Sequence, residues 1–326
     1  MSDTLPDPLL GPLLAGDRRA LARAITLVES TRADHRERAD ALMAEVLPHT
    51  GKSVRLGITG VPGVGKSTFI ERFGLGLIEA GRSVAILAID PSSKRGGGSI
   101  LGDKTRMEEL SRNERAFIRP SPAGATLGGV ARRTREAMLL LEAAGFDTVI
   151  VETVGVGQSE TAVSDMVDMF VVLLLPAGGD DLQGIKRGVI ELADLIVVNK
   201  ADGDLKATAG RSAADYRHAL HMLRSPTVGW TPEVSTASAI SGEGVLAVWE
   251  VVGRFLQAVG EKGVTRRRAE QARAWMWNEV GETLLAELRR NPEVRRLVAG
   301  LERDVEAGRT TPAAAARTML EAFHGR

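Results

Sequence analysis

The pattern of apolar and polar positions divides the chain into three segments. In residues 1–50 apolar side chains recur every three or four positions, which predicts helices, and Asp17 is placed to cap one of them. Residues 51–260 alternate short runs rich in β-branched residues with polar turns and helical stretches, and residues 261–326 return to a helical period. We therefore predict a helical N-terminal extension, a central α/β domain and a helical C-terminal region.

The central segment predicts a mostly parallel sheet flanked by helices. Each apolar run leads through a turn into a helical stretch, which is the alternation of βαβ units. The runs are apolar throughout, as expected of strands buried on both faces. The predicted strands are residues 54–59, 84–89, 148–151, 169–175 and 195–198.

The C-terminal segment predicts three helices. Apolar residues from Ala269 to Leu288 are spaced by three or four and form one stripe of a long helix. Asn291 and Thr311 each precede a proline, the pairing of an N-cap with the first turn of a further helix. Large apolar residues gather in this region and indicate either a local core or a subunit interface. They are Trp275, Met276, Trp277 and Leu285.

Composition excludes several classes of protein. With 42 Lys and Arg against 42 Asp and Glu among 326 residues, the net charge is zero, and no overall field favours nucleic acid or an anionic membrane. The absence of cysteine excludes disulfides and thiolate metal sites. The longest apolar run, residues 169–175, is too short to span a bilayer, and no basic segment followed by an apolar one marks a targeting signal. We expect a cytoplasmic protein.

The first predicted strand leads directly into a P-loop. The sequence GVPGVGKS occupies residues 60–67, and a helical stretch follows from Thr68. In such a loop the glycines let backbone N–H groups surround phosphate oxygens, Lys66 reaches the β and γ oxygens, and the Ser67 hydroxyl binds Mg²⁺. The candidate nucleotide contacts are Gly60, Pro62, Gly63, Val64, Gly65, Lys66, Ser67 and Thr68.

A second motif predicts recognition of guanine. The strand at 195–198 ends in Asn199, Lys200, Ala201 and Asp202, and the carboxylate of Asp202 can accept from N1–H and the 2-amino group of the base. The alternative is that Asp202 caps a helix in an ordinary turn. Farther on, Ser238, Ala239 and Ile240 are expected to present backbone amides to the guanine O6.

Carboxylates at the ends of two other predicted strands are candidate Mg²⁺ ligands. Asp90 and Glu152 follow the strands at 84–89 and 148–151, and either can hold the metal directly or through water. Asp103, after a glycine-rich loop, is a third metal candidate or a plain helix cap. Gly155 allows a backbone N–H to approach the γ-phosphate.

Two further loops bear on turnover and regulation. Many GTPases carry a water-positioning Gln directly after the glycine equivalent to Gly155, where this chain has Val156. We therefore predict slow intrinsic hydrolysis that a partner accelerates. The loop at 176–186 is either a simple connection or a switch that signals the nucleotide state through Asp180, Gln183 and Lys186.

Six separated blocks closely resemble the MeaB/ArgK family of P-loop GTPases, which includes methylmalonyl-CoA mutase-associated GTPases. They are GITGVPGVGKSTFIE (57–71), AIDPSSKRGGGSILGDKTRM (88–107), VIVETVGVGQSE (149–160), LLLPAGGDDLQGIKRG (173–188), VNKAD (198–202) and SAISGEG (238–244).

This resemblance implies a G domain of the SIMIBI class with a C-terminal dimerisation arm, hence a homodimer. It implies a chaperone that gates cofactor loading and protects an adenosylcobalamin-dependent mutase. It assigns catalysis to Lys66, Glu152 and Asp103, a metal and switch shell to Asp90, Asp103 and Glu152, and communication with the mutase to the loop containing Asp180.

Other functions use the same nucleotide-binding core. A kinase, such as those named for arginine or ornithine transport, also holds a γ-phosphate, but nothing beyond scattered arginines marks an acceptor pocket. A metal-insertion GTPase of the hydrogenase or urease maturation type would need ligands for nickel, and the sequence has no cysteine and no histidine cluster. A binding module with a degenerate site is disfavoured by the intact Lys66, Ser67 and Asp202.

Overall fold

The computed structural model describes residues 6–89, 107–121, 127–153, 159–176 and 187–325. The chain forms two compact units, Met1–Gln271 and Ala272–Arg326. The division into three functional segments at residues 50 and 260 stays a prediction.

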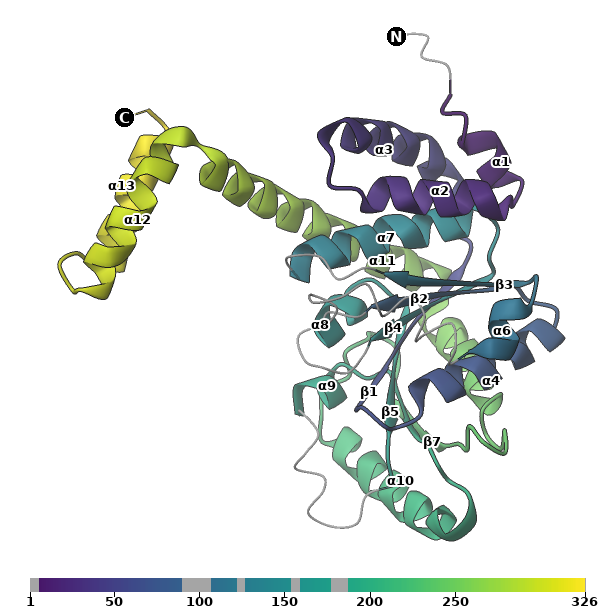
Figure 1. Ribbon diagram of the computed structural model, residues 1–326. Coiled ribbons are helices and arrows are strands. Elements are labelled where there is room, and N and C mark those ends of the chain that lie inside the picture. Colours follow the sequence, from purple (N-terminus) through teal and green to yellow (C-terminus); the bar gives the residue numbers. More distant parts are fainter. Residues whose placement is uncertain (1–5, 90–106, 122–126, 154–158, 177–186, 326) are drawn as a thin grey trace. The chain divides into compact units, whose positions relative to one another are not determined.

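A parallel sheet of seven strands forms the centre of the first unit (Figure 1). The strand order is β3-β2-β4-β1-β5-β6-β7, and all neighbouring strands pair in parallel. This confirms the predicted α/β class. The strands are β1 (Val54–Gly60), β2 (Val84–Ile89), β3 (Ala116–Ser121), β4 (Thr148–Thr153), β5 (Met169–Leu174), β6 (Leu195–Val198) and β7 (Glu233–Thr236).

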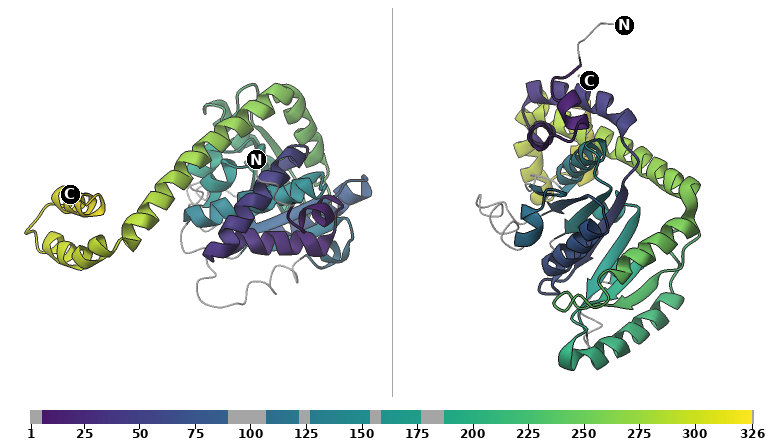
Figure 2. Two further views of the ribbon diagram at one scale, coloured as in Figure 1. Left: turned by 90° about the horizontal axis from the view of Figure 1, so that it is seen from above. Right: turned by 90° about the vertical axis from the view of Figure 1, so that its right-hand side faces the viewer.

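Helices cover both faces of this sheet (Figure 2). Leu56 and Ile58 of β1 join a buried core with residues of α4 (Lys66–Glu79) and the first part of α11 (Ala247–Arg290). Gly57 faces Val163 of α8 (Ser159–Ser164) on the other side. The helices of this unit before α11 are α1 (Leu10–Leu14), α2 (Arg18–Glu29), α3 (Ala33–Val46), the 3₁₀ turn η1 (Leu47–His49), α4 (Lys66–Glu79), α6 (Glu108–Arg112), α7 (Leu127–Ala143), α8 (Ser159–Ser164), α9 (Arg187–Glu191), η3 (Gly203–Leu205) and α10 (Lys206–His221).

The N-terminal helices pack on α7, as Figure 1 shows. Asp17 caps α2 as predicted, because its carboxylate accepts from the N–H groups of Arg19 and Ala20, both at 2.8 Å. Glu29 of α2 pairs with Arg119 of β3 at 2.5 Å. The extension is therefore joined to the edge strand of the sheet as well as to α7.

Helix α11 (Ala247–Arg290) is interrupted at Gly260, whose φ of 67° is open to glycine at little cost. Beyond this kink, Arg268 binds the buried carboxylate of Asp168 at 2.5 and 2.7 Å. The side-chain amide of Gln271 donates to the carbonyl of Val167 at 2.9 Å. These bonds hold α11 against the edge of the sheet where β5 begins. The last of them is made by Gln271, the final residue of the first unit.

The second unit is entirely helical, which confirms that prediction. It contains the end of α11, α12 (Pro292–Glu306) and α13 (Pro312–Phe323). The predicted caps are present, since the side chains of Asn291 and Thr311 accept from N–H groups in the first turns of α12 and α13. None of the described helices is both long and apolar enough to cross a membrane.

Three of the four large apolar residues that the sequence places together in the second unit are exposed. Met276 is 53% exposed, Trp277 65% and Leu285 46%. The structure therefore excludes a local core at these three side chains, and the subunit interface stays a prediction.

Candidate functional site

The P-loop follows β1 at the edge of the sheet where all strands end. Its glycines take conformations that other residues rarely adopt, with φ of 81° at Gly63 and 91° at Gly65. Helix α4 begins at Lys66, two residues before the predicted start at Thr68. The first N–H groups of a helix have no partner within the helix, so the start of α4 offers donors and a positive dipole end to an anion.

Lys66 lies inside the loop that precedes it. Its side chain is buried, and Nζ donates to the carbonyl oxygens of Gly60 at 2.7 Å and Val61 at 3.3 Å. A Cβ at Gly60 would lie 2.5 Å from the carbonyl oxygen of Leu173, so only glycine allows β5 to approach the loop this closely. The loop is therefore folded around its lysine and held against the neighbouring strand.

Asn199 joins three loops of the predicted site. Its buried side chain donates from Nδ2 to the carbonyl of Val64 at 2.8 Å, and its Oδ1 accepts from the N–H of Ala239 at 3.1 Å. A Cβ at Gly65 would lie 3.0 Å from Asn199 Nδ2. The P-loop, the 199–202 turn and the 238–240 loop are thus brought together, as the two motifs predict.

The residues predicted to recognise the base all lie in the described part of the chain. Lys200 has a left-handed backbone, with φ of 59°. Asp202 precedes η3, but its side chain makes no capping hydrogen bond, which removes the helix-cap alternative. The N–H of Ser238 donates to the carbonyl of Glu243 at 2.9 Å and that of Ala239 to Asn199, so two of the three predicted amides already have acceptors.

Ser67 and Glu152 form the described part of the predicted metal site. The Ser67 Oγ lies 3.4 Å from Glu152 Oε1, although the two residues are 85 positions apart. A hydroxyl and a carboxylate are oxygen ligands of the kind that Mg²⁺ prefers, so the side chains present fit this ion. The remaining predicted residues lie outside the described part of the chain: Asp90, Asp103, Gly155, Asp180, Gln183 and Lys186.

Two buried threonines at this edge were missed by the sequence reasoning. The hydroxyl oxygens of Thr59 and Thr153 are 2.6 Å apart, and both side chains are inaccessible to solvent. Their position was a usable signal, since Thr59 directly precedes the P-loop and Thr153 directly follows Glu152.

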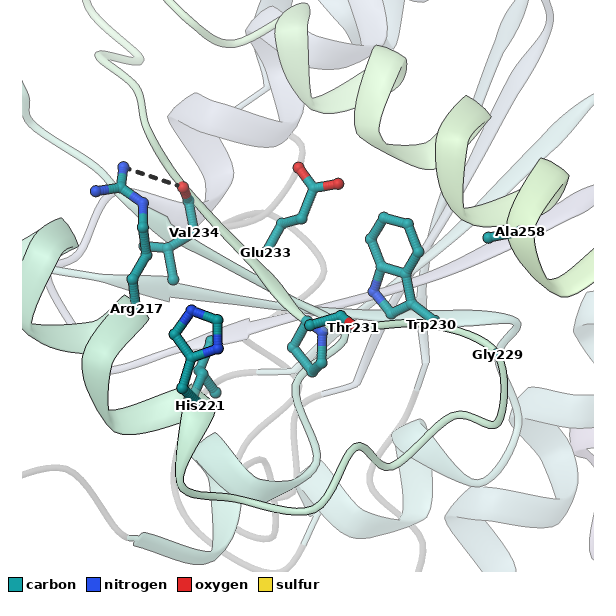
Figure 3. Close-up of a pocket in the computed structure, with 10 residues that line it drawn as sticks. Arg217, His221, Gly229, Trp230, Thr231, Glu233, Val234 and Ala258 are labelled. Carbon is teal, nitrogen blue, oxygen red and sulfur yellow. Dashed lines mark hydrogen bonds between the residues drawn. The ribbon is translucent and has the colours of Figure 1, made fainter.

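A separate cavity of about 500 Å³ lies between α10 and β7 (Figure 3). Glu233 lines it from the start of β7, Trp230 from the segment before this strand, and Arg217 from α10. Since the strands run in parallel, the start of β7 is at the edge of the sheet opposite the P-loop. This cavity is therefore distinct from the nucleotide site.

Comparison with known proteins identifies the family. The family described as methylmalonyl Co-A mutase-associated GTPase MeaB matches residues 21–293. The chain belongs to this family. It is 59% identical to a Caulobacter vibrioides protein over 97% of each chain. It is 49% identical to the Mus musculus protein named methylmalonic aciduria type A homolog, mitochondrial, covering 98% of this chain and 80% of the mouse protein.

A solved structure supports the same grouping. The crystal structure of a protein named LAO/AO transport system kinase is 38% identical and superposes with a TM-score of 0.78, covering 98% of this chain and 100% of the other. Together with the P-loop geometry, membership of the family makes the protein a P-loop GTPase that binds and hydrolyses GTP.

Proposed function

We propose that this GTPase is a chaperone of an adenosylcobalamin-dependent mutase, with methylmalonyl-CoA mutase as the client. In this role GTP hydrolysis gates cofactor loading and protects the mutase from inactivation. The family description and the name of the mouse relative support the choice of client. Binding of a guanine nucleotide is supported by the two hydrogen bonds of the Asn199 side chain. They join the P-loop, the 199–202 turn and the 238–240 loop.

Guanine selection rests on Asp202 and the 238–240 loop. The Asp202 carboxylate, which makes no capping bond, accepts from N1–H and the 2-amino group of guanine. Since the amides of Ser238 and Ala239 already donate to Glu243 and Asn199, Ile240 is the residue of this loop whose amide donates to O6. Adenine would face the carboxylate with an acceptor and leave it without a donor, which disfavours ATP.

Phosphate binding and hydrolysis rest on Lys66, Ser67 and Glu152. The ammonium of Lys66 exchanges the Gly60 and Val61 carbonyls for β and γ oxygens and stabilises the charge that develops during transfer to water. Ser67 and Glu152, with Asp90 and Asp103, hold Mg²⁺ directly or through water. Mg²⁺ at this position neutralises phosphate charge.

Partner contacts are assigned to two regions. The loop carrying Asp180, Gln183 and Lys186 passes the nucleotide state to the mutase. The exposed apolar residues of α11, among them Trp277 and Leu284, pair two copies of the chain into a homodimer. We further propose a cytoplasmic location and no binding to nucleic acid or membrane.

The test is steady-state GTP turnover by the purified protein, alone and with methylmalonyl-CoA mutase. We expect slow hydrolysis of GTP, none of ATP, and acceleration by the mutase that serum albumin at equal concentration does not reproduce. Lys66→Ala should abolish both the slow and the accelerated rate. If the mutase does not change the rate of GTP hydrolysis, the assignment of methylmalonyl-CoA mutase as the client is wrong, whereas the GTPase activity still stands.

The name of the 38% identical structure raises a kinase as the second candidate. A kinase would transfer the γ-phosphoryl group to an amino acid, whereas a GTPase transfers it to water. Incubation with γ-³²P-GTP and either arginine or ornithine distinguishes the two. We expect all of the label in inorganic phosphate, and labelled amino acid would overturn the chaperone assignment.

A further inference from the structure

We propose that Thr59 and Thr153 are positioning residues for GTP hydrolysis, which act by holding the Glu152 end of β4 against the P-loop. Their hydroxyl oxygens are 2.6 Å apart in a buried environment. Thr59 is followed by Gly60, whose carbonyl holds Lys66, and Thr153 is preceded by Glu152. One hydrogen bond thus links β1 and β4 at the ends that lead to Lys66 and carry Glu152.

The backbone ladder explains why such a link is needed. The parallel pairing of β1 with β4 ends at Ile58 and Glu152, so the threonine pair continues the connection one residue beyond the ladder. On its other side β4 remains paired with β2 as far as Thr153. Among the described residues, the hydroxyl bond is therefore what ties Thr153 to β1, directly after the last ladder pair at Glu152.

The threonine bond affects the position of Glu152, because the contact between Glu152 and the P-loop is long. The distance from Glu152 Oε1 to Ser67 Oγ is 3.4 Å, which is the outer limit of a hydrogen bond. A small displacement of the β4 end separates these two oxygens further. Misplacement of a catalytic group by about 1 Å can reduce a rate by about 100-fold.

The chemistry of the pair sets the choice of variants. Replacing one threonine by valine leaves the other hydroxyl buried without a partner, which destabilises the protein for reasons unrelated to catalysis. The double variant Thr59→Val, Thr153→Val removes both hydroxyls and keeps the shape of the side chains, so it folds at close to wild-type stability. Thr153→Ser keeps the hydroxyl and serves as the conservative variant.

Thr148 provides a matched control. It lies at the other end of β4 and is fully buried, and its hydroxyl has no hydrogen-bond partner among the residues that the structure describes. Thr148→Val therefore makes the same chemical change in the same strand far from the P-loop, and we expect its kcat to equal that of the wild type.

The experiment measures kcat and KM for GTP, and Kd for GDP, in these variants. We expect the double valine variant to lose about 10- to 100-fold in kcat, with KM and the Kd for GDP within about threefold of wild type. Thr153→Ser should retain kcat within about threefold. A double valine variant that hydrolyses GTP at the wild-type rate would overturn the proposal. So would an equal loss in Thr148→Val, or a loss of GDP affinity as large as the loss of kcat.

Discussion

At the scale of single residues, the motifs predicted which side chains meet but not how they are held. The P-loop and the 199–202 turn follow β1 and β6, as the motifs predict, because glycine, lysine and asparagine at fixed spacing have little structural use outside such a site. The bond from Asn199 to Val64 joins residues 135 positions apart, and it depends on the fold rather than on local pattern. The bond between Thr59 and Thr153 likewise depends on the fold, so the motifs did not predict it.

Asp202→Asn tests the assignment of base recognition. The amide presents a donor to the N1–H or 2-amino group in place of an acceptor, so we expect about 10- to 100-fold weaker binding of GTP and a relative gain for xanthosine triphosphate. Competition of both nucleotides against labelled GDP measures the change. Asp204→Asn, in the adjacent turn, is the control and should bind GTP normally. Unchanged preference in Asp202→Asn would show that another group reads the base.

Lys66→Ala tests the phosphate site. The residue is buried in the P-loop and is the cation that the proposed function assigns to the phosphates. Its removal should reduce kcat for GTP by at least about 100-fold, which is the usual cost of losing one donor to developing charge. Phosphate release under saturating GTP measures it, with exposed Lys52→Ala as the control. Turnover at the wild-type rate would place the phosphate site elsewhere.

At the scale of elements, the strongly apolar strands were predictable and the edge strands were not. The runs at β2 and β6 were predicted to the residue, whereas β3 and β7, at the two edges of the sheet, were not predicted as strands. β3 contains Arg119 and Pro120, and β7 has four residues of which only Val234 is apolar. Edge strands are partly solvated, so their sequences lack the continuous apolar run that marks a central strand.

Gly57→Ala tests the packing of α8 on β1. A Cβ at Gly57 would lie 2.8 Å from Phe170, 2.9 Å from Val163 and 3.0 Å from Val167. We expect a loss of about 1–3 kcal/mol in the free energy of unfolding, measured by urea denaturation. Gly210→Ala is the matched control, because nothing lies within 4 Å of its Cβ in α10. That variant should gain about 0.5–1 kcal/mol from helix propensity. Equal stability of the two variants would contradict the close packing.

At the scale of the whole molecule, the part of α11 after Gly260 runs from the first unit into the second. Its residues up to Gln271 are bonded to the first unit by buried polar contacts, whereas Met276, Trp277, Val280 and Leu284 expose apolar side chains at helical spacing. Exposed apolar patches of this kind mark interaction surfaces. The helical pattern was readable from the sequence, but exposure depends on which elements pack together.

Leu284→Glu tests whether a second copy of the chain covers this stripe. The side chain is 52% exposed in the single chain, and a carboxylate there would be buried without a partner in a symmetric interface. We expect the dimer dissociation constant to rise at least about tenfold in analytical ultracentrifugation, since about 1.4 kcal/mol suffices for that change. Glu282→Lys, on the opposite side of the same helix, should leave the association unchanged. GTP turnover without the mutase should be the same in both variants, because the nucleotide site lies within the first unit. If the Leu284→Glu variant dimerises with the wild-type dissociation constant, the stripe is not the interface between copies.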